Sequence, residues 1–227
     1  MSEKPVPELE FSEKYDAEHA KYYFVKHEHE FWRRLSNWRD HQILRKALRI
    51  AGNPKSVLDA PCGTGRFWDV LAENPERVIH ASDYSQNMID AGMAYRAPEL
   101  TRRIKVFQAS AFSLPVPDNF VESIACIRFI HHLTKPEDRL TLLKEFHRVA
   151  SDSVIVSLWV DGNLKSWVRN AREKKRSETH RYQNRLVIPA DVIEQEFQQC
   201  GFKVEARLDF IKYYHMWRTY VLRKVPA

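Results

Sequence analysis

The sequence is poor in cysteine and glycine, and neither residue occurs in the patterns that mark specialised folds. Three cysteines, Cys62, Cys126 and Cys200, occur among 227 residues, and no CxxC pair is present. An odd, widely spaced set argues against a disulfide framework or a zinc ribbon, so we expect reduced thiols. There are six glycines and no internal repeat or low-complexity linker, which predicts a single domain.

Long apolar runs are also absent. The longest stretches, such as residues 153–160, are far shorter than the roughly 20 residues of a membrane-spanning helix. Residues 1–13 alternate charge with proline and lack the apolar region and cleavage site of a secretory signal. We therefore expect a soluble, cytoplasmic protein without a membrane span.

The charge balance is mildly basic. Lysine and arginine total 36 against 30 acidic residues, which gives a net charge of +6 and a pI near 9.2. This excess favours an anionic partner, but it does not distinguish RNA, a phosphorylated sugar, an acidic protein or simple solubility. Hydrophobic residues make up 44% of the chain. A chain of this length buries roughly 70% of its unfolded surface and needs no metal or disulfide to hold a core.

Short apolar runs alternate with helical segments from residue 56 onward. The predicted strands span residues 56–60, 77–82, 104–108, 122–127, 153–159, 203–210 and 215–224. The predicted helices begin at residue 67 and span 86–95, 136–149 and 188 to about 200. This order predicts an α/β fold with a mostly parallel seven-stranded sheet, an antiparallel C-terminal edge and helices on both faces.

The segment before the first strand is expected to be helical. Residues 12–50 lack glycine and proline, and the later part carries apolar residues at mostly helical spacing. We predict one or two helices there. In this division residues 1–52 form a helical cap or lid within the same domain, and residues 53–227 form the core.

The loop after the first strand predicts a ligand site. Asp59 ends the strand, a tight turn containing Gly63 and Gly65 follows, and a helix comes next. In an open parallel sheet ligands bind beyond the carboxyl ends of the strands, and glycine lets them approach the backbone. A third glycine, which a dinucleotide fingerprint requires, is missing, so a pyrophosphate is disfavoured. Asp59 suits a cationic or amino-bearing ligand instead.

Residues 57–67 resemble motif I of the class I S-adenosylmethionine (SAM) dependent methyltransferases, which have a Rossmann-like fold. Asp83, at the end of the second strand, stands where that family has an acidic residue that binds both ribose hydroxyls. Residues 110–115 resemble the adenine-side loop, and residues 125–133 resemble the fourth-strand motif ending in His-Leu. The resemblance implies that SAM, with S-adenosylhomocysteine as product, is bound by Asp59, Ala60, Pro61, Cys62, Gly63, Gly65, Asp83, Tyr84, Met88, Ser110, Ala111 and Ile127.

Two residues depart from the family pattern. Pro61 replaces the commonest first glycine, and we expect a trans peptide before it. Ser110 replaces an aspartate that accepts from the adenine amino group, and an uncharged acceptor is weaker.

Methyl transfer needs in-line positioning of the acceptor, sometimes a base, and no metal. His131 and His132 follow the fourth strand, so we identify them as catalytic candidates, with structural support as the alternative role. Arg128 is expected either to contact the acceptor or to pack against the sheet rim. Further acceptor contacts are predicted in the aromatic N-terminal segment and in a basic insertion at about residues 161–187, which could also be a solvated helix: Tyr15, Tyr22, Tyr182 and Arg185.

The sequence therefore predicts a SAM-dependent methyltransferase acting on O or N of an anionic small or medium-sized metabolite or glycan. An RNA or protein acceptor stays open as an alternative. So does a SAM-binding sensor or scaffold without catalysis, which the substitution at Ser110 favours slightly. A nucleotide-dependent oxidoreductase is disfavoured by the short glycine turn. The sequence does not define the oligomeric state.

Overall fold

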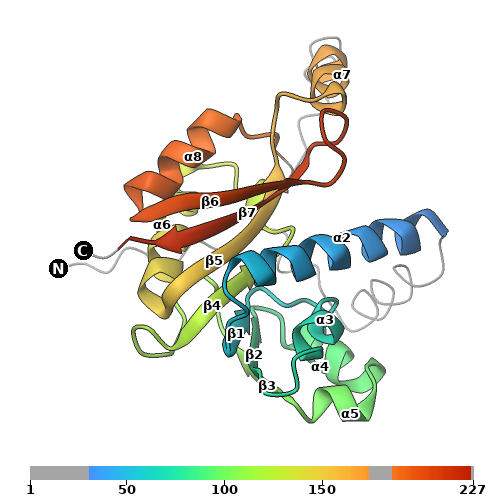
Figure 1. Ribbon diagram of the computed structural model, residues 1–227, viewed down its shortest axis with the longest axis vertical. Coiled ribbons are helices and arrows are strands. Elements are labelled where there is room, and N and C mark those ends of the chain that lie inside the picture. The colour runs from blue at the N-terminus through green and yellow to red at the C-terminus, as the bar shows by residue number, and fades with distance from the viewer. Residues whose placement is uncertain (1–30, 174–185, 226–227) are drawn as a thin grey trace.

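The central element of the protein is a seven-stranded sheet with the strand order β3-β2-β1-β4-β5-β7-β6 (Figure 1). A computed structural model describes residues 31–173 and 186–225. Strands β1 to β5 pair in parallel, whereas β7 lies antiparallel between β5 and β6. The strands are β1 (Ser56–Asp59), β2 (Val78–Asp83), β3 (Ile104–Gln108), β4 (Val121–Cys126), β5 (Ala150–Trp159), β6 (Phe202–Asp209) and β7 (Trp217–Lys224). The predicted fold class is confirmed.

The helices begin where the local chemistry favours a helix start. Helix α6 has Pro136 in its first turn together with two carboxylates, which suit the positive end of the helix dipole. Helix α4 is capped by Ser85, whose side chain accepts from the Met88 amide. The helices are α2 (Phe31–Ile50), α3 (Trp68–Ala72), α4 (Gln86–Tyr95), α5 (Pro98–Thr101), η2 (Ile130–His132), α6 (Pro136–Val149), α7 (Leu164–Glu173) and α8 (Ala190–Gln199).

The boundaries of α4, β3 and α6 agree with the predicted ranges, and the other predicted boundaries from residue 50 onward lie within three residues of the observed ones. The predicted helix start near residue 12 lies outside the described residues. Two α-helices, and the short 3-10 helix η2, were not predicted as separate elements. The short α5 follows α4 after a break at Ala97-Pro98, and α7 occupies the first half of the basic insertion.

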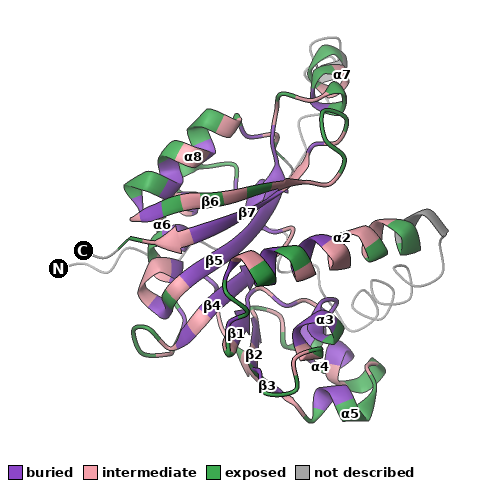
Figure 2. Cartoon of the chain, viewed as in Figure 1, coloured by how far each residue is buried: buried purple, intermediate pink, exposed green. Residues whose placement is uncertain are grey.

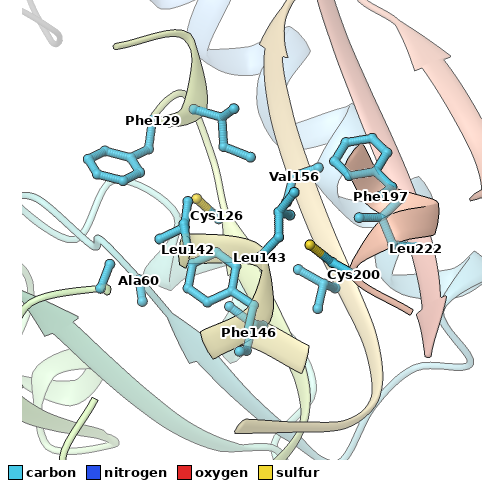
Figure 3. Packing of buried hydrophobic residues seen from close by; sticks show 14 of the residues in the cluster. Ala60, Cys126, Phe129, Leu142, Leu143, Phe146, Val156, Phe197, Cys200 and Leu222 are labelled. Carbon is cyan, nitrogen blue, oxygen red and sulfur yellow. The ribbon is translucent and has the colours of Figure 1, made fainter. Parts of the chain in front are cut away.

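Two apolar layers hold the helices against the sheet. Neighbouring strand residues point to opposite faces, so Val57 packs with α2, α3 and α4 while Leu58 packs with α6 and α8. Figure 2 shows the central strands buried and the outer helix surfaces exposed. Figure 3 shows the second layer, where Phe146 and Phe197 face the sheet beside the thiols of Cys126 and Cys200. All three cysteines are buried and unbridged.

Helix α2 connects the beginning and the end of the described chain. It contacts β6 and β7, and Arg39 Nε donates to the Phe210 carbonyl at 2.9 Å. Four of the predicted acceptor residues, Tyr15, Tyr22, Tyr182 and Arg185, lie outside the described residues. Within the described residues, no helix has the length and apolarity needed to cross a membrane.

Candidate cofactor and acceptor site

The turn after β1 is held against the end of β2. The Cys62 amide donates to the Ser82 carbonyl at 2.8 Å, and the Gly63 amide donates to Asp83 Oδ2 at 2.8 Å. Gly65 has a φ of +69°, and a Cβ atom there would lie 2.4 Å from the Trp68 ring, so no side chain fits. The turn therefore places a backbone amide beside the carboxylate that ends β2.

The peptide between Ala60 and Pro61 is cis, so the expected trans geometry was wrong. Bonds before proline prefer trans by only about 0.5–1 kcal/mol, which tertiary context can outweigh. The sequence of the turn alone therefore could not decide the isomer.

Asp59 carries a buried acceptor that the described residues do not satisfy. The side chain is 1% exposed, and its Oδ2 atom has no hydrogen-bond partner among them. Burial, reinforced by the negative charge of Asp83, raises the pKa of Asp59 well above its usual value, while the nearby Trp68 indole N–H opposes the rise. A cationic or amino-bearing ligand would satisfy this oxygen and stabilise its ionised form, which fits the amino and sulfonium groups of SAM.

Asp83 lies at the end of β2 and is already fixed by the backbone. Its Oδ1 atom accepts from the Ser85 amide at 3.0 Å, and its Oδ2 atom accepts from Gly63. Burial raises the pKa of Asp83, while these amide donors oppose the rise. A carboxylate has about four acceptor positions, so the two amides leave capacity for a vicinal diol.

The other predicted cofactor residues gather at the same edge of the sheet. Gln108 Nε2 donates to the Tyr84 carbonyl at 2.9 Å, and Ser110 Oγ accepts from the Phe112 amide at 3.3 Å. Tyr84 is exposed and Ile127 is partly exposed, whereas Ala60, Cys62, Met88 and Ala111 are buried. Burial raises the pKa of the Cys62 thiol well above its usual value, which disfavours a nucleophilic thiolate.

The two candidate histidines differ in exposure. His131 is 2% exposed, and its ring centroid lies 4.7 Å from that of Trp217 and 5.1 Å from that of Trp159. His132 is partly exposed, with its ring centroid 4.0 Å from that of His131. The arrangement favours packing for His131 and leaves His132 as the better placed to meet an acceptor.

Arg128 belongs to a charged cluster that the sequence did not reveal. Asp40, on α2, pairs with Arg66 Nη2 at 2.5 Å and with Arg128 Nη2 at 2.7 Å. The Arg128 guanidinium lies 4.2 Å from the Trp217 ring centroid, and the residue has a φ of +63°. Arg66 follows the glycine turn after β1, and Arg128 follows β4. The Asp40 carboxylate therefore links the candidate cofactor loop to the end of β4, where an acceptor is expected.

Asp40 and Arg66 were not identified from the sequence as site residues, whereas Trp217 was a candidate for either the pocket wall or the sheet core. Asp40 is the one acidic residue in the sequence of α2, where basic residues are frequent. That isolated carboxylate was the available signal, but its partners lie 26 and 88 positions further along the chain.

Among the described residues, several basic side chains gather at this edge. Asp40 is shared between two guanidinium groups, Arg169 lies over the Trp159 ring at 5.0 Å, and Lys165 lies over the Tyr214 ring at 5.3 Å. This gathering of basic side chains suits an anionic acceptor.

The positive charges at this edge also affect the pKa of His215. Burial lowers the pKa of His215 to about 4, with help from Lys165 and Arg128, while Asp40 opposes the change. The unfolded chain binds this proton near pH 6.5, so stability falls as pH drops below about 6.5 and levels off below about 4. After allowance for solvent screening, we expect a loss of about 1–2 kcal/mol. Urea unfolding across this range should show a smaller loss for His215→Gln, and equal losses would contradict the prediction.

The strand order, the glycine turn after β1 and the carboxylate ending β2 together define a class I methyltransferase fold. Residues 57–153 match the family described as "Methyltransferase domain". Over this segment, which is less than half of its length, the chain is similar to SAM-dependent methyltransferases.

Two curated relatives and one solved structure illustrate this likeness. The chain is 33% identical over 120 residues to a demethylmenaquinone methyltransferase of Geobacillus stearothermophilus, covering 52% of this chain and 49% of the relative. It is 32% identical over 116 residues to a "Probable S-adenosylmethionine-dependent methyltransferase" of Mycobacterium tuberculosis, covering 51% of this chain and 39% of that protein. The chain thus spans about half or less of the length of these relatives.

The solved structure is the magnesium protoporphyrin IX methyltransferase of Synechocystis PCC 6803 with bound S-adenosylhomocysteine. It superposes with a TM-score of 0.66 at 13% identity and covers 86% of this chain and 88% of that chain. At this identity the likeness concerns the fold alone.

Proposed function

We propose that the protein transfers the methyl group of SAM to O or N of an anionic small or medium-sized metabolite or glycan. The observation that supports the choice of acceptor is the gathering of basic side chains at this edge, where Arg66 and Arg128 share Asp40 and Arg169 lies over the Trp159 ring. The three unbridged cysteines support a reducing, cytoplasmic compartment.

Different residues at the carboxyl edge of the sheet would bind SAM and orient the acceptor. Bound SAM supplies an electrophilic methyl group on its sulfonium. Asp59 offers a buried acceptor to the cationic part of the ligand, and Asp83 offers its free acceptor capacity to the ribose hydroxyls. Ser110 and Ala111 would contact the adenine ring of SAM. Arg128 and Trp217 would then form the wall against which the acceptor is oriented.

We extend the proposal to the domain organisation. Residues 1–52 act as a cap in the same domain as the core at residues 53–227. Support comes from α2, where Asp40 reaches both sides of the site and Arg39 reaches the β6–β7 loop.

Incubation with methyl-labelled SAM and fractionated extract tests the proposal. Label should concentrate in the fraction of small anionic metabolites and glycans, with Arg128→Gln reducing it and the exposed Lys105→Gln leaving it unchanged. Demethylmenaquinone should be assayed alongside, because a relative is named for it. Label confined to RNA or to protein would overturn the proposed acceptor class while retaining methyl transfer.

His132→Ala should keep SAM affinity and lower turnover roughly tenfold, because a positioned contact worth about 1.4 kcal/mol is lost. His147→Ala is a suitable control, since His147 lies on α6 and packs on Phe202 with ring centroids 5.2 Å apart. Turnover is measured with saturating SAM, and binding by calorimetry. Unchanged turnover, or a variant that unfolds, would assign His132 a structural role.

A SAM-binding sensor or scaffold is the second candidate. The observation that favours it is Ser110, whose hydroxyl already accepts from the Phe112 amide. This reading predicts calorimetric SAM binding without enzyme-dependent label in any fraction. Restoring the acid with Ser110→Asp should then tighten binding without creating turnover.

A further inference from the structure

Helix α7 and the β6–β7 loop form one projecting unit. The Leu164 amide donates to the Tyr213 carbonyl at 2.9 Å, and the Lys165 amide donates to the Tyr214 carbonyl at 3.1 Å. Figure 1 shows both segments projecting beyond the sheet at the top of the view. We refer to residues 164–171 and 210–216 as the tip. These backbone bonds hold its two parts in a fixed relation.

The tip exposes large apolar and aromatic side chains. Trp167 is 70% exposed, Tyr213 is 74% exposed and Leu164 is 51% exposed. Leu164 and Trp167 are three residues apart and therefore share one face of α7, which is turned to solvent. Ile211 and Tyr214 are exposed beside them. Isolated apolar residues are common on surfaces, but a group of five on a projection indicates a contact surface.

Positive charge accompanies these side chains. The tip contains Lys165, Arg169 and Lys212, and its two segments contain no aspartate or glutamate. Lys165 Nζ lies 5.3 Å from the Tyr214 ring centroid, and Lys212 Nζ lies 4.8 Å from that of Tyr213. Protein surfaces that lie at a membrane–water interface typically combine tryptophan and tyrosine with lysine.

We propose that the tip docks on the surface of an anionic lipid bilayer. Trp167, Leu164 and Tyr213 enter the headgroup region, while Lys165 and Lys212 meet lipid phosphates. RNA would match the charge and the aromatic rings, but it offers no counterpart for the aliphatic side chains of Leu164 and Ile211. This binding is separate from methyl transfer and stands whether or not the chain is catalytic.

Co-sedimentation with vesicles tests the proposal on the full chain at low salt. Vesicles of phosphatidylcholine with phosphatidylglycerol should bind the protein at least about tenfold more tightly than phosphatidylcholine alone. Lys165→Gln with Lys212→Gln should weaken that binding roughly 25-fold, because each neutralised charge contributes about fivefold. Trp167→Ala with Tyr213→Ala should weaken it at least about tenfold.

Matched controls separate the tip from the general basicity of the chain. Lys46 and Lys203 are exposed lysines elsewhere, and Trp38 is an exposed tryptophan on α2. Their Lys→Gln and Trp→Ala variants should bind vesicles as the parent does. Circular dichroism melts check that all variants fold, which is expected because the substituted side chains are exposed. Equal binding by tip and control variants, no preference for anionic vesicles, or tip-dependent binding of RNA without vesicle binding would each overturn the proposal.

Discussion

Asp40→Ala lowers the free energy of unfolding by about 3–5 kcal/mol, the largest effect that we expect from a single substitution. The Asp40 and Arg66 side chains are each 10% exposed, and that of Arg128 is 23% exposed. Removing the carboxylate leaves two guanidinium groups facing one another without their shared partner. Chemical denaturation followed by circular dichroism measures the loss.

The same helix supplies a control. Arg45 pairs with Glu73 at 2.6 Å, but these side chains are 33% and 47% exposed. Glu73→Ala should therefore cost less than about 1 kcal/mol. Asp40→Asn should fall between the two, because the amide keeps one acceptor oxygen but loses the charge. A loss for Asp40→Ala as small as that for Glu73→Ala would show that the cluster does not stabilise the fold.

Asp83→Ala weakens SAM binding by at least about 1.5 kcal/mol, or more than tenfold, because two charge-assisted hydrogen bonds to the ribose are removed. The loss is increased by a second effect. Asp83 also fixes the Gly63 and Ser85 amides, so the turn after β1 is less well ordered in the variant. Isothermal calorimetry at constant pH measures the affinity.

Asp90→Ala provides the comparison for Asp83, since Asp90 lies on the exposed side of α4 and pairs with Gln86. It should leave SAM affinity unchanged. Asp83→Asn retains one acceptor oxygen and should lose less affinity than alanine. Full affinity in a folded Asp83→Ala protein would refute the assignment of Asp83 to the ribose.

The fold and the cofactor edge could be predicted because their signals are local. Alternating apolar runs define the strands, and the order of Asp59, the glycine turn and Asp83 marks the carboxyl ends of β1 and β2. The acceptor edge could not be predicted in the same way. Asp40 is recognisable as a site residue only through its ion pairs with Arg66 and Arg128. The packing role of His131 likewise depends on Trp159 and Trp217. These partners are distant in sequence and come together only in the folded protein.

Helix α2 was predicted from its apolar positions. Leu44, Ala47 and Leu48 do pack on the core, whereas Leu35 and Trp38 are exposed. The contacts of its polar residues, such as the ion pairs of Asp40, could not be predicted from that pattern. The same limit applies to the basic insertion, where charge density was visible but the outward apolar face of Leu164 and Trp167 was not. The same sequence can be interpreted as a solvated charge run or as an amphipathic surface helix. The exposure of its apolar side chains in the structure distinguishes the two.

The contacts of α2 with the end of the chain have a consequence for the order of folding. Arg39 meets Phe210, and Arg223 Nη2 donates to the Ile50 carbonyl at 3.3 Å, across separations of 171 and 173 residues. A ribosome releases the first partner of each pair long before the second. Strand β7 also has to enter between β5 and β6 after both have been synthesised. Such contacts raise the contact order and slow folding, so the candidate site is completed only after the segment that forms β7 is free to fold.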